Sequence, residues 1–278
     1  MISNKNEFRK DPSEKEIKFI LELFNSNKFI EAKKEINKQI IKYPNSSILF
    51  NILGAVLAGQ NQFDEAIKNY KKAIKINSDY AQAYNNLGVV LHKLDKINEA
   101  IDNYKKAINF KTDFAEAFNN LGNGMRELNR LKDALQYFKK ATQIKSNYAE
   151  AYNSLGLALQ GQGRMQEAEK VFHRGITANS MDIDIQNNLG NLYAQMQNWK
   201  DAADSFRRAL EIDVNFDAAR AGLGNIFWKL GQYAEAEQEC RSAIKINTSF
   251  PRHILISFLA KPIILLRVLI VCLFSLLK

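Results

Sequence analysis

The sequence repeats itself at a fixed interval of 34 residues. The string AYNNLG at 83–88 returns as AFNNLG at 117–122, AYNSLG at 151–156 and IQNNLG at 185–190, with looser copies at 49–54 and 219–224. A fixed period of this length is the signature of repeat proteins, in which each unit buries its apolar face against its neighbours. The period therefore constrains the fold more than any other feature.

We number each repeat so that the glycine of the NLG string occupies position 8. Six units then follow one another without an insertion, and an atypical unit precedes them, at 13–46, 47–80, 81–114, 115–148, 149–182, 183–216 and 217–250. Residues 1–12 are expected to form a flexible lead. Residues 251–278 are expected to form an apolar tail, so the chain is predicted to be one long array with two short ends.

Two apolar stripes recur in the units. Positions 4, 7, 8 and 11 carry mostly apolar or small residues, and so do positions 20, 24 and 27. These spacings place each set on one face of a helix, and short polar turns such as KLDK at 93–96 separate the two sets. Each unit is therefore predicted to be a helix-turn-helix hairpin, and the chain an all-α solenoid without strands, with an apolar C-terminal helix.

Small residues are expected to mark the crossing of the two helices. Position 20 is alanine in all seven units and position 8 is glycine in six. Helices approach closely only where neither carries bulk, so we expect the glycine and the alanine to face each other. Aromatic rings at position 24 are expected to fill the space between hairpins: Tyr70, Tyr104, Phe138, Phe172 and Phe206.

This combination of positions resembles the tetratricopeptide repeat family over residues 13–250. The resemblance implies a right-handed superhelix whose first helices line a concave groove. Within the family, the asparagine-rich repeats of this chain are most similar to the repeat region of O-linked N-acetylglucosamine transferases. Family members usually carry proline at position 32, whereas here only Pro44 does. At that position Ser78, Thr112, Ser146 and Ser180 are expected to cap the following helix instead.

Amide side chains recur at positions 5, 6 and 9, which are expected to face the groove. An amide has both a donor and an acceptor, so a row of them can pair with the main chain of an extended peptide. The predicted peptide-binding residues are Asn51, Asn85, Asn86, Asn119, Asn120, Asn123, Asn153, Ser154, Asn187, Asn188 and Asn191. The alternative is that the asparagines are structural. Acidic chaperone tails are not expected as partners, because position 5 is never basic and position 6 is not basic in any of the six units from 47 to 250.

The sequence offers no constellation for catalysis or metal binding. The two cysteines, Cys240 and Cys272, have no disulfide or metal-ligand spacing, and the three histidines fall at unrelated places. We therefore predict no catalytic residue, no metal, no cofactor and no enzymatic activity. Cys240 replaces a position-24 aromatic and is expected to be a buried apolar residue.

The net charge of +9 is distributed unevenly. Residues 1–148 carry 25 Lys and Arg against 17 Asp and Glu, whereas residues 149–250 carry 10 against 13. Basic pairs at positions 25 and 26 are expected to align along the second helices. Because no aromatic residues are interleaved for base stacking and acids interrupt the second half, nucleic acid is not expected as a partner.

Three functions fit the sequence. The favoured one is a non-catalytic scaffold that binds extended segments of other proteins. The second is the substrate-targeting region of a truncated or split glycosyltransferase or sulfotransferase. The third is a membrane-anchored assembly factor, because residues 254–277 contain 17 Leu, Ile, Val or Phe, although Lys261, Pro262 and Arg267 oppose insertion. A tail that caps the solenoid or has no role is the alternative to an anchor. Without an apolar segment at the N-terminus, the array is expected in the cytoplasm.

Overall fold

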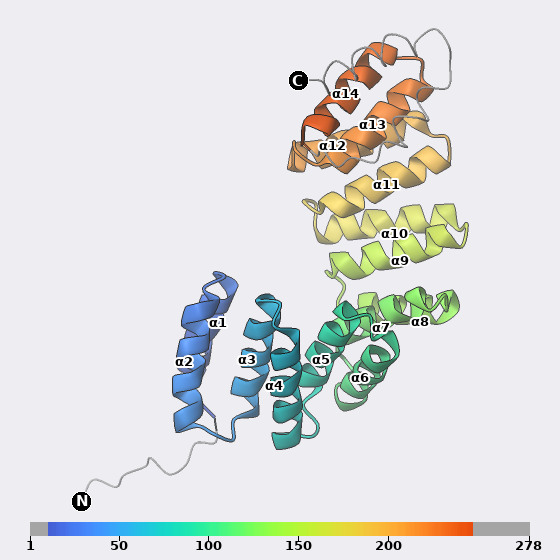
Figure 1. The fold of residues 1–278 in the computed structure, drawn as a ribbon. Helices are drawn as coiled ribbons and strands as arrows, with labels where there is room; N and C mark the ends of the chain where they lie inside the picture. Colours follow the sequence, from blue (N-terminus) through green and yellow to red (C-terminus); the bar gives the residue numbers. More distant parts are fainter. Residues whose placement is uncertain (1–10, 247–278) are drawn as a thin grey trace, which may run out of the picture. The chain divides into compact units, whose positions relative to one another are not determined.

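The computed structural model describes residues 11–246, which fold into helices joined by short turns (Figure 1). These residues contain fourteen helices and no strand, so the all-α prediction is confirmed for them. The chain divides into two compact units, Met1–Lys145 and Ser146–Lys278. The sequence did not predict this division, and each unit is described by itself below.

The described part of unit 1, residues 11–145, contains four helical hairpins. Its helices are α1 (Glu14–Asn25), α2 (Phe29–Lys42), α3 (Ser47–Gly59), α4 (Phe63–Ile76), α5 (Ala81–Lys93), α6 (Ile97–Phe110), α7 (Ala115–Glu127) and α8 (Leu131–Ile144). The two helices of each hairpin pack together, and the second helix of one hairpin packs against the first helix of the next. The unit is therefore a continuous stack.

The described part of unit 2, residues 146–246, contains three hairpins built in the same way. Its helices are α9 (Ala149–Gly161), α10 (Met165–Ala178), α11 (Ile183–Gln195), α12 (Trp199–Ile212), α13 (Asp217–Lys229) and α14 (Tyr233–Ile246). From α3 onward, the first helices begin 34 residues apart in the sequence. The predicted helix-turn-helix pattern is therefore present in both units.

The turn inside each hairpin has a left-handed residue at position 15. The φ angles lie between 56° and 77° at Asn27, Asn61, Asp95, Asn129, Gly163, Gln197 and Gly231. Asn, Asp and Gly tolerate this backbone region better than other residues, which explains six of the seven. Several asparagines of the sequence thus serve a turn and are unrelated to the groove.

The glycine at position 8 makes room for an aromatic ring. A Cβ atom on Gly88 would lie 2.6 Å from Cε1 of Tyr104 and 3.2 Å from the carbonyl oxygen of Ala100. The nearest neighbour is therefore the position-24 ring, and the prediction that glycine mainly faces alanine was incomplete. The ring also reaches the next hairpin, because a Cβ on Gly222 would lie 2.5 Å from Cζ of Phe206.

The turn between repeats differs from the prediction. The first helices begin after an N-cap residue at position 34. The serines and the threonine at position 32 lie two residues too early, so the expectation that they cap the following helix was wrong. Side chains cap the helix only at Ser46 and Asp182 in the repeats from α3 to α13. At three turns a side chain at position 31 instead accepts from the backbone N–H two residues later: Asn77, Asn179 and Asp213.

The predictions for the chain ends concern residues outside the described part. The apolar C-terminal helix and the membrane anchor fall on 251–278, and most of the flexible lead falls on 1–10. Between residues 11 and 246, no helix has both the length and the apolar character that a bilayer crossing requires.

Candidate functional site

The first helices carry the predicted asparagines, but not all of these face open solvent. Asn51, Asn85 and Asn119 are buried, with exposed fractions of 6%, 5% and 0%. Asn153 and Asn187 are partly exposed. The expectation that position 5 points into an open groove is therefore wrong for the three residues of unit 1. Position 5 lies at the edge of the buried arc of the helix, where the next hairpin covers it.

The position-5 amides hold consecutive hairpins together. In each observed pair, Nδ2 of a position-6 asparagine donates to Oδ1 of the position-5 asparagine one repeat earlier. The pairs are Asn86 with Asn51 at 3.1 Å, Asn120 with Asn85 at 2.9 Å, and Asn188 with Asn153 at 2.9 Å. Buried amides need hydrogen-bond partners, and these pairs supply them. We call this set the amide ladder, and it favours the structural alternative for position 5.

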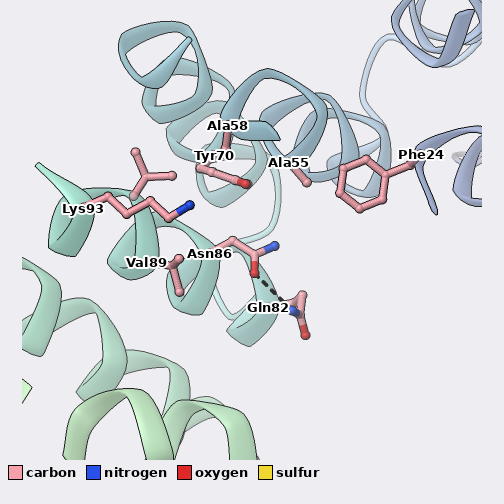
Figure 2. A pocket seen from close by; sticks show the side chains of 9 residues that line it. Phe24, Ala55, Ala58, Tyr70, Gln82, Asn86, Val89 and Lys93 are labelled. Atoms are coloured by element: carbon pink, nitrogen blue, oxygen red, sulfur yellow. Dashed lines mark hydrogen bonds between the residues drawn. The ribbon is translucent and has the colours of Figure 1, made fainter. Parts of the chain in front are cut away.

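A hollow of about 330 Å³ lies on the first helices of unit 1 (Figure 2). It is lined by Phe24, Ala55, Ala58, Tyr70, Gln82, Asn86, Val89, Val90 and Lys93. Figure 2 shows Phe24 at one end and Lys93 at the other. The only predicted binding residue in it is Asn86, whose amide donates to Asn51 and whose Oδ1 accepts from Gln82 Nε2 at 3.2 Å. This hollow offers mainly apolar surface and one cation.

A second hollow, of about 460 Å³, lies on the first helices of unit 2. It is lined by Leu157, Gln160, Asn188, Asn191, Ala194, Gln195, Trp199, Asn225 and Lys229. Asn191, Gln195 and Asn225 are exposed. Of the predicted residues, Asn188 and Asn191 meet here. The sequence prediction missed the amides at positions 12 and 13, although the helical spacing placed those positions on the same face.

Ser154 and Asn123 belong neither to the amide ladder nor to the lining of the two hollows. Ser154 is buried, with 8% exposed. Asn123 of α7 is partly exposed, and its Oδ1 atom is buried without a hydrogen-bond partner among the residues that the structure describes. Because this oxygen is buried, it does not present an acceptor to a ligand in the groove.

Titratable groups near the first helices make structural contacts. In unit 1, Nε2 of His92 lies 2.9 Å from Oε2 of Glu127, and its Nδ1 lies 3.4 Å from the Tyr104 hydroxyl. Burial, together with the negative charge of Glu127, raises the pKa of Tyr104. The phenol therefore stays protonated at neutral pH, and the three side chains link successive repeats.

No metal site is found in the described residues. Nowhere between residues 11 and 246 do three or more His, Cys, Asp or Glu side chains gather in a metal-binding arrangement. Cys240 is partly buried, whereas the sequence predicted a buried residue, and a Cβ on Gly224 would lie 3.0 Å from its Sγ.

Family models identify the architecture. Models described as TPR repeat match residues 54–95, 91–124 and 125–163, and models described as tetratricopeptide repeat match residues 149–178 and 187–250. The chain belongs to the tetratricopeptide repeat family. Membership supports a role as a protein–protein interaction scaffold, and the family fold is typical of non-catalytic proteins. The closer likeness to O-linked N-acetylglucosamine transferases stays a prediction.

Solved structures of tetratricopeptide repeat proteins are similar to this chain. One chain of the APC/C Cut9–Hcn1 hetero-tetramer is similar over 82% of this chain and 45% of its own length, with a TM-score of 0.70 and 16% identity. The present chain therefore spans less than half the length of that chain. YrrB, described as having an unusual peptide-binding site, matches 66% of this chain and 95% of its own, with a TM-score of 0.52 and 26% identity. MamA matches 61% and 92%, with a TM-score of 0.52 and 25% identity. No curated protein matches the sequence.

Proposed function

We propose that the protein is a non-catalytic scaffold that binds extended segments of other proteins along its first helices. The observation that carries this proposal is the hollow of unit 2, where Asn191, Gln195 and Asn225 present exposed amides that make no hydrogen bond within the described chain. Amides without internal partners can pair with the N–H and C=O groups of a peptide main chain. The peptide-binding site of YrrB supports the same use of the fold.

The proposed roles of the predicted residues fall into two groups. Asn51, Asn85 and Asn120 shape the groove through the amide ladder, because their polar atoms are used between hairpins. Asn191 contacts the ligand directly, together with Asn225, which lies at the same position 9 of the next repeat, and Gln195, which the sequence prediction did not include. The apolar hollow of unit 1, taken by itself, receives an aliphatic or aromatic side chain of a bound segment. We place this scaffold in the cytoplasm.

Replacement of the exposed amides tests the proposal. The triple variant Asn191→Ala, Gln195→Ala and Asn225→Ala should weaken the binding of short random-sequence peptides by roughly 1–3 kcal/mol, since a hydrogen bond contributes roughly 0.5–1.5 kcal/mol net. The loss should be similar for peptides of different sequence, because the main chain is contacted. Several peptides of unrelated sequence are taken from a random library by their binding to the wild-type protein, and fluorescence anisotropy of each labelled peptide gives the measurement.

A matched variant controls for the loss of amides in general. Gln166 and Gln238 are exposed on the second helices α10 and α14 of the same unit, away from the first-helix hollow. Gln166→Ala with Gln238→Ala should leave peptide binding unchanged. Equal binding by the triple variant and the wild type, with unchanged circular dichroism, would refute the assignment of this hollow.

A further inference from the structure

The second helices of unit 1 carry a row of exposed lysines. Positions 25 and 26 are both lysine in α4, α6 and α8, and all six side chains are exposed: Lys71, Lys72, Lys105, Lys106, Lys139 and Lys140. We call this set the lysine ridge. Consecutive hairpins of the unit stack in one register, so the pairs recur on the same side of each second helix. The sequence pattern predicted the alignment, but the proposed function does not use it.

These charges are not neutralised within unit 1. Over residues 11–145, no described acid forms an ion pair with any lysine of the ridge. Most acids of α4, α6 and α8 lie in the first turn, and Asp102 is the nearest exception along the helices. In unit 2, by contrast, the basic residue at position 25 of α12 is paired: Arg207 Nη1 lies 2.8 Å from Asp204 Oδ1. The ridge is therefore a local concentration of unpaired positive charge.

Aromatic rings lie directly beside the ridge, so the expectation that no aromatic residues accompany the basic pairs was wrong. The Lys72 ammonium lies 3.9 Å from the centre of the Phe50 ring, and the Lys106 ammonium lies 5.7 Å from that of Tyr84. Phe110 follows Lys106 by one turn, stacks on Tyr84 with a centroid distance of 5.5 Å, and is 45% exposed. Lysines thus flank an apolar ring that faces solvent.

A second exposed apolar side chain lies at the equivalent end of α2. Ile41 is 84% exposed and lies in the last turn of that helix. Its neighbours Lys38 and Lys42 are paired with Glu35 at 3.6 Å and Glu16 at 3.3 Å, so Ile41 adds apolar surface while the unpaired charge comes from the ridge. Exposed apolar residues next to lysines are the composition of surfaces that rest on a bilayer, where the cations meet anionic headgroups and the apolar groups enter the interface.

We propose that the lysine ridge of unit 1 binds the anionic surface of a lipid bilayer. Lysine is a flexible point charge that suits a diffuse field of headgroups, whereas guanidinium forks would favour fixed phosphate recognition. Phe110 is already stacked on Tyr84, so one face of its ring is not available to stack on a nucleic acid base. The ridge is separate from the first-helix hollows.

Vesicle sedimentation with the full chain tests the proposal. The chain should bind phosphatidylcholine vesicles that contain roughly a third phosphatidylserine, and binding should fall steeply as salt is raised, since surface charges are screened. A basic residue at an anionic membrane contributes about fivefold in affinity, so Lys139→Gln with Lys140→Gln should weaken binding roughly 10- to 30-fold. Replacement of all six lysines by glutamine should abolish it.

Matched variants separate this surface from other sources of binding. Arg207→Gln with Arg208→Gln removes two charges at the same register in unit 2 and should change the affinity less than about twofold, because Arg207 is already paired. Phe110→Ser keeps every charge and should still weaken binding several-fold. Unaltered folding of each variant is checked by circular dichroism.

Three results would overturn the proposal. If the chain binds vesicles of phosphatidylcholine alone as tightly as vesicles that contain phosphatidylserine, its membrane affinity comes from an apolar segment, such as residues 254–277, and not from the ridge. No effect of the six-lysine variant would have the same consequence. Tighter binding to a duplex nucleic acid fragment than to anionic vesicles, lost in the six-lysine variant but kept in Phe110→Ser, would make the ridge a nucleic acid surface.

Discussion

At the scale of single residues, backbone conformation explains part of the asparagine content. Position 15 of the seven repeats requires a positive φ angle, and Asn, Asp or Gly occupies it except in one repeat. Gln197 is the exception, with a φ of 58°. A left-handed residue with an ordinary side chain is strained by roughly 1–2 kcal/mol. The repeat 183–216 therefore carries a local strain that its neighbours avoid.

This strain gives a prediction for Gln197→Gly. The variant should raise the free energy of unfolding of unit 2 by roughly 0.5–1 kcal/mol, because relief of the left-handed strain outweighs the added freedom of glycine in the unfolded chain. Gly163→Ala is the reverse test, because Gly163 has a φ of 74°. An added Cβ at this site would meet no atom within 4 Å, so only the backbone conformation opposes the alanine side chain. It should destabilise the unit by a similar amount in urea unfolding. A stabilising Gly163→Ala would contradict the explanation.

At the scale of helices, the sequence predicted the hairpins but not what each hairpin covers. The periodicity predicted that Gly88 and Ala100 face each other and that Tyr104 fills the space between hairpins, whereas the structure buries the Tyr104 ring against Gly88 itself. Periodicity does not reveal the edge of the buried arc, because this depends on the neighbouring hairpin. Asn85 therefore appeared as a groove residue, whereas Asn120 of the next hairpin covers it and hydrogen-bonds to it.

The close approach of helices predicts opposite effects for two glycines of unit 2. In α11, a Cβ on Gly190 would lie 2.7 Å from Cε1 of Phe206, a ring that is 1% exposed and also confined by Gly222. Gly190→Ala should therefore destabilise the protein by roughly 1–3 kcal/mol through overpacking. Gly161→Ala, at the last residue of α9 with no atom within 4 Å, should be neutral or stabilise by up to about 1 kcal/mol. Thermal unfolding of both variants checks the signs, and a neutral Gly190→Ala would show that the ring can move.

At the scale of the whole molecule, stacked hairpins depend on the contacts between neighbours. The stability of such arrays is approximately the sum of the hairpins and the interfaces between them. The amide ladder adds a polar contact to these interfaces within each unit, between α3, α5 and α7 in unit 1 and between α9 and α11 in unit 2. The sequence showed that the asparagines recur. The donor and the acceptor of each pair lie about one repeat apart in the sequence. A local pattern therefore does not distinguish a hydrogen-bonded pair of asparagines from a row of asparagines that face the groove.

The final prediction therefore concerns the coupling between hairpins. Asn85→Ala should lower the local stability of α5 and α7 by roughly 1–3 kcal/mol, because Asn85 is 5% exposed and its loss leaves Asn120 without its acceptor. The double variant with Asn120→Ala should cost less than the sum of the single variants, with a coupling of roughly 0.5–1.5 kcal/mol. Native-state hydrogen exchange reports these local free energies, and Asn109→Ala, at an exposed site on α6, is the control. If Asn85→Ala changes protection no more than this control, the asparagine faces the groove as the sequence first suggested, and the ladder does not couple the repeats.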